Sequence, residues 1–122
     1  MKEIKFRSWS KDNKKMLYGN DLQGRIFFGN DGVGTIGTSF TLMQLTGLKD
    51  RKGKEIWEGD VVEYTYETYS GENSVVGVVS FDGEQFGLEL SSQWIPIAGK
   101  DSEDFEVKGN AYENPNLISK NN

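Results

Sequence analysis

Short runs of alternating apolar and polar residues, separated by glycines, are the feature that most constrains the fold of this chain. Val62, Tyr64 and Tyr66 alternate with polar residues, which is the period of a half-buried β-strand. Fifteen of the 122 residues are glycine, well above the average share of about 7%, and they bound most of these runs. No long stretch has a helical period. The pattern predicts an all-β fold with at most one or two short helical turns, built as small coiled, bent antiparallel sheets or a partly open barrel.

The turn-forming residues divide the chain into a series of expected hairpins and strands. In chain order these are a hairpin over 3–18, a strand at 25–28, a strand within 38–48, a polar hairpin between Leu48 and Ile56, a tight turn at 58–60, the strand that starts at Val62, a central strand at 74–81, a hairpin turn at 82–84, a returning strand through Phe86, Leu88 and Leu90, a last strand through Phe105 and Val107, and a turn or helical stub after Pro115. We find no repeat or linker, so we predict one domain over residues 1–118 and a frayed tail at 119–122.

The amino-acid composition excludes several classes of site. The chain has no cysteine and no histidine, which rules out disulfides, thiolate metal sites, Cys nucleophiles and Ser-His-Asp chemistry. The N-terminal residues lack an apolar stretch of signal-peptide length, and no segment approaches the roughly 20 apolar residues of a membrane span. We therefore expect a cytoplasmic protein that binds no membrane, with no metal and no cofactor.

Charge is distributed unevenly along the chain. Residues 1–15 carry six Lys and Arg side chains, whereas residues 55–99 carry nine acidic side chains and no basic one. A duplex-binding module normally has a dominant basic face, so the acidic half argues against DNA. Two alternatives remain: both halves are solvated strand faces, or the basic N-terminal edge of one subunit meets the acidic half of another.

Two glycine-rich segments come close to phosphate-binding motifs. Residues 32–37 match GxGxxG, but no convincing helix follows, so we expect a flexible loop there. Between Gly47 and Gly53 there are five residues instead of four, and Glu55 follows Lys54 where a nucleotide-binding loop needs Ser or Thr. Residues 47–55 therefore fit a polar hairpin better than a phosphate loop.

Glu58 and Asp60 are the carboxylates most open to a catalytic interpretation. Two neighbouring carboxylates can divide the roles of acid and base. An i, i+2 pair across a turn is also a common structural arrangement, in which Asp accepts backbone N–H bonds. We favour the structural interpretation and expect that the protein is not an enzyme.

Three blocks of sequence resemble the YopX family of small phage and prophage proteins. They are EIKFRSWSKDNKKM at 3–16, QLTGLKDRKGKEIWEGDVVEY at 44–64 and VKGNAYENPNLI at 107–118, and together they cover essentially the whole chain. The middle block is long and specific. Trp57 stands where the family usually has Tyr or Phe. Residues 19–42 and 66–104 carry no family signature.

The resemblance implies a mostly β fold and a phage or prophage origin, but no activity, substrate, cofactor or catalytic residue. The residues that match the family motif are types that form turns, and we interpret them as structural; they are Gly47, Asp50, Gly53, Glu58, Gly59, Asp60, Gly109, Asn110, Tyr112, Asn114 and Pro115. The second half also looks like a small barrel of the Src-homology-3 type, which is an analogy of fold alone.

Two hypotheses of function follow from these observations. The first is a non-catalytic accessory protein that forms homo-oligomers and binds a host or phage protein. The alternative is a factor associated with nucleic acid or nucleotides, in which basic residues contact phosphates and aromatic residues stack on bases. The candidate binding surface consists of Lys5, Arg7, Trp9, Lys49, Arg51, Lys52, Lys54 and Trp57, with Lys2 and Phe6 as further nucleic-acid contacts. Core or interface packing is the favoured role of the aromatic residues.

Overall fold

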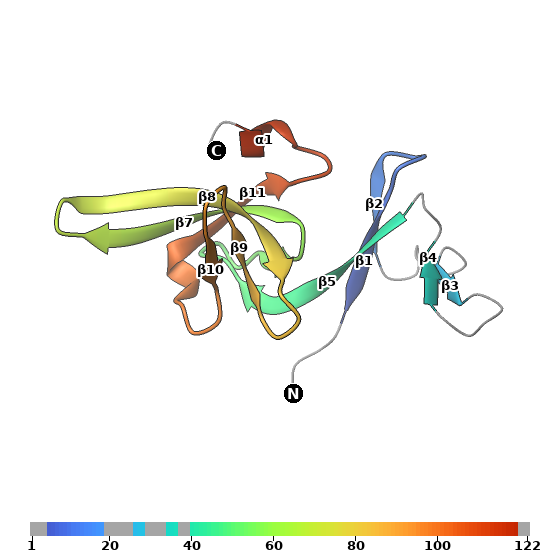
Figure 1. Ribbon diagram of the computed structural model, residues 1–122, viewed down its shortest axis with the longest axis horizontal. Helices are drawn as coiled ribbons and strands as arrows, with labels where there is room; N and C mark the ends of the chain where they lie inside the picture. Colours follow the sequence, from blue (N-terminus) through green and yellow to red (C-terminus); the bar gives the residue numbers. More distant parts are fainter. Residues whose placement is uncertain (1–4, 19–25, 29–33, 37–39, 120–122) are drawn as a thin grey trace. The chain divides into compact units, whose positions relative to one another are not determined.

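The structure is a computed structural model, which describes residues 5–18, 26–28, 34–36 and 40–119 (Figure 1). The chain divides into two compact units, Met1–Leu45 and Thr46–Asn122, and each is described by itself. The single domain over 1–118 stays a prediction. Ser119, which we placed in the tail, is the last residue of a short helix, and residues 120–122 lie outside the described part.

Almost all regular structure is β, which confirms the predicted fold class. The elements are β1 (Phe6–Ser10), β2 (Lys15–Tyr18), β3 (Ile26–Phe28), β4 (Gly34–Ile36), β5 (Phe40–Lys49), β6 (Glu55–Trp57), β7 (Asp60–Thr68), β8 (Gly71–Phe81), β9 (Phe86–Glu89), β10 (Trp94–Pro96), the 3-10 helix η2 (Ser102–Asp104), β11 (Phe105–Asn110) and α1 (Asn116–Ser119). One sheet has the order β2-β1-β5-β6, a second has the order β10-β9-β8-β7-β11, and β3 pairs with β4.

The first unit contains the predicted N-terminal hairpin. β1 and β2 are antiparallel, with Ser10 opposite Lys15, and the described part of the hairpin predicted over 3–18 is therefore confirmed. Lys14 adopts a positive φ of 54° in the turn, where its N–H donates to the carbonyl of Ser10 at 2.7 Å. β1 also pairs with β5, and Leu17 and Met43 are buried.

The GxGxxG segment differs from our expectation. Residues 34–36 form strand β4, which pairs antiparallel with β3 (Ile26–Phe28), so this part of the motif is not the loop that we predicted. The glycines at 32 and 37 lie outside the described residues. Residues Gly34, Thr35 and Ile36 are compatible with a strand, because Thr and Ile are β-branched and favour extended backbone.

The second unit is built on a five-stranded antiparallel sheet. β8 is its middle strand, as the apolar pattern of 74–81 predicts, and the turn at 82–84 leads into β9. The hydrophobic core combines side chains from one face of this sheet with Ile56 of β6 and with Ile97, which follows β10. The members from the sheet are Val62, Val79, Leu88 and Phe105, and every core member is at most 2% exposed. The short strand β10 was not predicted because Trp94–Pro96 is only three residues long and contains Pro, which sheets tolerate at an edge.

The β5–β6 turn covers the outer edge of β11 within this unit. The backbone N–H of Arg51 donates to the carbonyl of Phe105 at 2.9 Å, and the carboxylate of Asp50 accepts from the N–H of Val107 at 2.9 Å. These bonds satisfy edge groups that would otherwise face solvent, so the β5–β6 turn protects the open edge of β11.

Candidate functional site

Asp50 organises the middle block of the family motif. Its Oδ1 accepts hydrogen bonds from the backbone N–H groups of Lys52 and Lys54, both at 2.9 Å, and its Oδ2 accepts from Val107. Burial raises the pKa of Asp50, but the N–H bonds from Val107, Lys54 and Lys52, with the charge of Lys54, outweigh it and lower the pKa below the ordinary value of 3.8. The carboxylate is thus committed to holding a turn and a strand together.

The pair Glu58 and Asp60 lies in a tight turn between β6 and β7. Asp60 is 3% exposed, and its Oδ2 accepts from the backbone N–H of Trp57 at 2.8 Å. Gly59 has a φ of 90°, which glycine adopts without strain. The N–H of Gly59 donates to Val79, and its carbonyl accepts from Ala111, each at 2.8 Å. The turn therefore ties β8 to the end of β11.

The C-terminal block of the motif forms a third turn around Asn110. Its Oδ1 accepts from the N–H groups of Tyr112 and Glu113 at 3.0 and 2.8 Å, and its Nδ2 donates to the Glu113 carboxylate at 2.7 Å. The Asn114 side chain accepts from the N–H of Asn110 at 3.2 Å. A Cβ on Gly109 would lie 2.4 Å from the Asn114 Oδ1, so only glycine fits beneath that side chain.

Of the remaining motif residues, Gly47 lies within β5, and Gly53 and Pro115 lie outside the strands. Gly47 and Gly53 have φ values of 88° and 81°, and Pro115 is exposed just before α1. Apart from Gly47, the described motif residues thus lie in or beside three hydrogen-bonded turns, and their structural role stays a prediction.

The candidate basic and aromatic surface is divided between the two units. Lys5, Arg7 and Trp9 lie in the first unit and the other members in the second. Arg7 is only 3% exposed and Trp57 only 8%, so neither side chain offers much surface for binding. Trp9 is half-buried, and the exposed members are Lys5, Lys49, Arg51, Lys52 and Lys54. Because their side chains are buried, Arg7 and Trp57 do not belong to the exposed part of the predicted surface.

Two of the exposed basic residues contact an acidic partner on β11. Lys52 Nζ lies 3.0 Å from one oxygen of Glu106, and Arg51 lies 3.8 Å from the other. Lys108 bridges Glu106 and Glu63 at 3.2 and 3.6 Å. The hydrogen bond from Lys52, followed by that from Lys108, lowers the pKa of Glu106. A phosphate would have to compete with this carboxylate for Lys52 and Arg51.

The most exposed feature of the second unit is one that the sequence patterns did not single out. β7 and β8 continue beyond the other strands of their sheet as a two-stranded arm, which we define as residues 65–74 (Figure 1). Tyr66 is 36% exposed, and the Tyr69 side chain at the tip is fully exposed. The signal was present in TYETYSGENS, a ten-residue strand-turn-strand segment with no aliphatic residue to bury.

A ladder of aromatic rings connects the arm to the core. Phe105 stacks on Tyr64 with ring centroids 5.1 Å apart, and Tyr64 stacks on Tyr66 at 5.7 Å. The ammonium group of Lys100 lies 6.0 Å from the centre of the Tyr64 ring, within the range of a cation–π contact. These contacts fix the base of the arm.

Metal-ligand groups and membrane-spanning helices are two further features to consider in the part of the chain that the structure describes. Among those residues no group of three or more acidic side chains is placed to hold a metal ion. The described helices are also too short and polar to cross a bilayer.

The fold and the three turns define a class of small, mostly β protein, with a curled half-barrel sheet and a second antiparallel sheet. A family model described as YopX protein matches residues 5–119, and the chain belongs to this family, which confirms the resemblance seen in the three sequence blocks.

Two solved structures are similar over nearly the whole chain. Protein EF1440 from Enterococcus faecalis matches with a TM-score of 0.62 and 26% identity, over 98% of this chain and 100% of that chain. Protein yopX from Bacillus subtilis matches with a TM-score of 0.62 and the same coverage at 22% identity, which supports the fold alone. A search among curated proteins found no match.

Proposed function

We propose that this protein is a non-catalytic phage or prophage accessory protein, which assembles with copies of itself and binds a host or phage protein in the cytoplasm of a bacterial host. The observation that carries the proposal is that one exposed turn in the first unit is basic and one exposed arm in the second unit is acidic. Lys11, Lys14 and Lys15 are exposed on the β1–β2 turn, whereas Glu67 and Glu72 are exposed on the arm.

This separation of charge favours association between different copies of the chain. Exposed opposite charges attract over roughly 10 Å at moderate salt, and complementary patches select partners and speed their encounter. The motif carboxylates Asp50 and Asp60 accept backbone N–H bonds in turns, which supports a structural role for them over a catalytic one. The charge pattern thus supports association, and the hydrogen bonds of Asp50 and Asp60 support the non-catalytic part of the proposal.

Light scattering coupled to size-exclusion chromatography tests the self-assembly. We expect the molar mass to exceed 13.7 kDa at about 0.02 M salt and to fall towards that of the monomer at about 0.5 M salt. A monomer at every salt concentration would contradict the proposal. A pull-down from lysogenic or infected cells with the tagged protein then identifies the bound host or phage protein.

The nucleic-acid alternative has weaker support. Arg51 and Lys52 contact Glu106, and Arg7 and Trp57 are buried, so the candidate surface offers fewer accessible groups to a nucleic acid than the sequence suggested. Fluorescence anisotropy with labelled single-stranded DNA and RNA at low salt is the direct test. The absence of a shift removes this alternative.

A further inference from the structure

The arm has two unpaired backbone edges. β11 pairs with β7 only as far as Tyr64, and β9 pairs with β8 only as far as Val78. In the described chain, no strand therefore pairs with residues 65–68 on one side or 71–76 on the other. Isolated two-stranded hairpins are marginally stable in water, and open edges invite pairing with another chain. An arm of this kind is therefore expected to gain stability from a partner.

The tip of the arm is nevertheless well organised. The Thr68 hydroxyl donates to the carbonyl of Gly71 at 3.0 Å and accepts from the Asn73 side chain at 2.9 Å. It also accepts from the backbone N–H of Ser70 at 3.3 Å. These bonds hold a two-residue turn in which Tyr69 points entirely into solvent. A held turn presents Tyr69 with little ordering cost on binding, and tyrosine is among the residues most enriched at binding hot spots.

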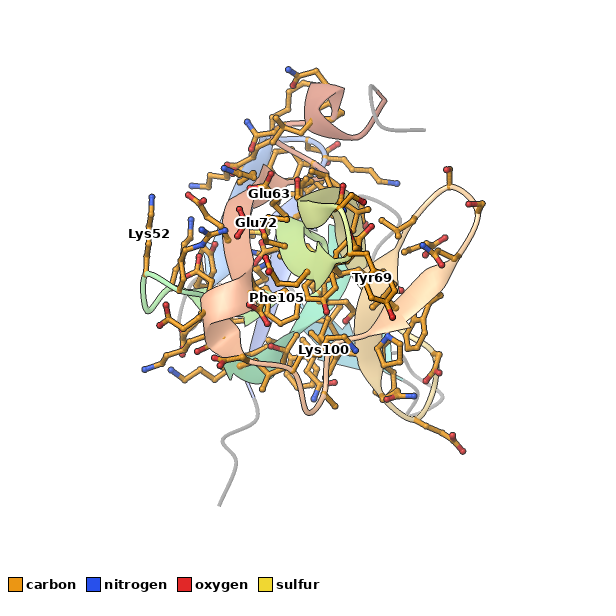
Figure 2. All side chains as sticks on the ribbon, turned by 90° about the vertical axis from the view of Figure 1, so that its left-hand side faces the viewer. Lys52, Glu63, Tyr69, Glu72, Lys100 and Phe105 are labelled. Atoms are coloured by element: carbon orange, nitrogen blue, oxygen red, sulfur yellow. The ribbon has the colours of Figure 1, made fainter. Side chains whose placement is uncertain are left out.

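The two acidic residues of the arm face each other. Glu67 is directly opposite Glu72 in the register of β7 and β8, and like charges in this position destabilise a strand pair. In Figure 2, which looks towards the tip, Glu72 lies on the same side of the hairpin as Glu63 and away from Tyr69. Glu63 is paired with Lys108 at the base, whereas the arm itself, residues 65–74, contains no Lys or Arg. A cation from a partner would relieve the repulsion.

The chain itself carries a matching basic surface. Lys11, Lys14 and Lys15 cluster on the exposed turn of the β1–β2 hairpin, against the single acid Asp12. The net charge of this turn is +2, from three Lys and one Asp, which equals in magnitude the charge of Glu67 and Glu72. Charge complementarity therefore favours a second copy of this chain as the occupant of the arm.

We propose that the arm of one copy docks on the β1–β2 turn of a second copy, with Tyr69 as the buried anchor and Glu67 and Glu72 paired with its lysines. This inference rests on the proposed self-assembly and names its surfaces. Because the two surfaces differ, the contact is heterologous, and repetition of it produces a closed ring or an open chain of subunits.

A charge-swap experiment tests the contact. One variant combines Glu67→Lys with Glu72→Lys, so that its arm is basic and still carries like charges in register. The other combines Lys11→Glu with Lys15→Glu, so that its turn is acidic. Each alone should run as a monomer at low salt because its arm and turn now repel. An equimolar mixture should assemble again, since the basic arm of the first variant fits the acidic turn of the second, and the acidic arm of the second fits the basic turn of the first.

A control pair separates this contact from a general effect of charge. Glu84→Lys with Glu103→Lys makes the same change in net charge at exposed positions outside the arm, and should keep the wild-type mass. The Tyr69→Ala variant retains all charges. Its dissociation constant for self-assembly should rise at least tenfold. Circular dichroism and thermal unfolding confirm that each variant folds.

The outcomes distinguish this inference from the proposed function. If the wild type assembles in a salt-dependent way but the arm and turn variants assemble equally well, the surfaces are wrong and the proposed self-assembly stands. If the control pair loses assembly as strongly as the arm variant, the arm is not the docking element. If the wild type is a monomer at every salt concentration, both proposals fail.

Discussion

The Asp50 carboxylate offers the sharpest test of how this fold is held together. Asp50 is 4% exposed, and its two oxygens accept three backbone N–H bonds from Lys52, Lys54 and Val107, each 2.9 Å long. Hydrogen bonds to a charged group contribute about 1.5–3 kcal/mol each. Lys52 and Lys54 are exposed, so when the carboxylate is removed, water can accept hydrogen bonds from their backbone N–H groups and offset much of the loss. Asp50→Ala should therefore lower the free energy of unfolding by about 3–5 kcal/mol.

Asp50→Asn gives a more discriminating result. An amide oxygen in place of Oδ1 keeps the bonds from Lys52 and Lys54, but the amide NH2 then faces the N–H of Val107 as donor to donor. We expect a loss of about 1.5–3 kcal/mol from this one long-range bond. Urea denaturation at pH 7, followed by tryptophan fluorescence, measures the change as a shift in midpoint with an unchanged slope. An unchanged midpoint would refute the proposed link between the β5–β6 turn and β11.

The same carboxylate predicts the sign of the pH dependence. The pKa of Asp50 is lowered on folding from the ordinary value of 3.8, so its stabilisation is fully present above that value and is lost as pH falls through the lower folded value. The wild type should lose stability below about pH 4, and Asp50→Asn should show a shallower loss over this range. Asp82→Asn is the comparison, because N–H bonds from Gln85 and Glu84 lower the pKa of Asp82 as well, but within one exposed turn; we expect it to change the pH dependence less than Asp50→Asn does.

Three further substitutions test local packing, each measured by the same denaturation assay. Gly87→Ala places a Cβ 2.4 Å from the ring of Trp94, so we expect a loss of about 1–3 kcal/mol and a shift in tryptophan emission; unaltered emission and stability would contradict that overlap. Asp60→Ala removes the acceptor of the buried Trp57 N–H and should cost about 1–3 kcal/mol, whereas a neutral result would mean that water replaces the carboxylate. Glu72→Lys turns a repulsive cross-strand pair into an attractive one and should stabilise the arm by about 0.2–1 kcal/mol; a loss of stability would contradict the register.

Local patterns in the chain were sufficient to predict most of the strands. The alternation at Val62 and Tyr64 identified β7, and the apolar run at 74–81 identified the middle strand of its sheet. The same alternation continued to Tyr66, which was expected on the apolar face. Tyr66 is nevertheless 36% exposed, because this part of the strand extends beyond the core. Periodicity assigns a residue to a face, but it does not state how far the covering layer extends.

The candidate surface shows the same limit. Lysines in a polar hairpin were correctly expected to be exposed, because turns lie at the surface. The burial of Arg7 and Trp57 could not be inferred, since both stand in strands whose neighbours are distant in sequence. Strand β4 was missed because three residues next to glycines carry too little pattern to identify.

The stretch QLTGLKDRKGKEIWEGDVVEY illustrates what sequence and structure each decide. Its residue types by themselves determined two turns, since Gly53 and Gly59 permit positive φ and Asp50 and Asp60 accept neighbouring N–H groups. They also determined the family, because the block is long and specific. These are short-range properties that each segment carries with it.

Only the tertiary structure decided what these turns hold together. Asp50 bonds to Val107, 57 positions along the chain, and Gly59 joins β8 to the residue that follows β11. The opposition of Glu67 and Glu72 likewise depends on the register of β7 with β8. Strand pairing sets all three, and it is selected by burial of the whole core, so no single segment of the sequence encodes it.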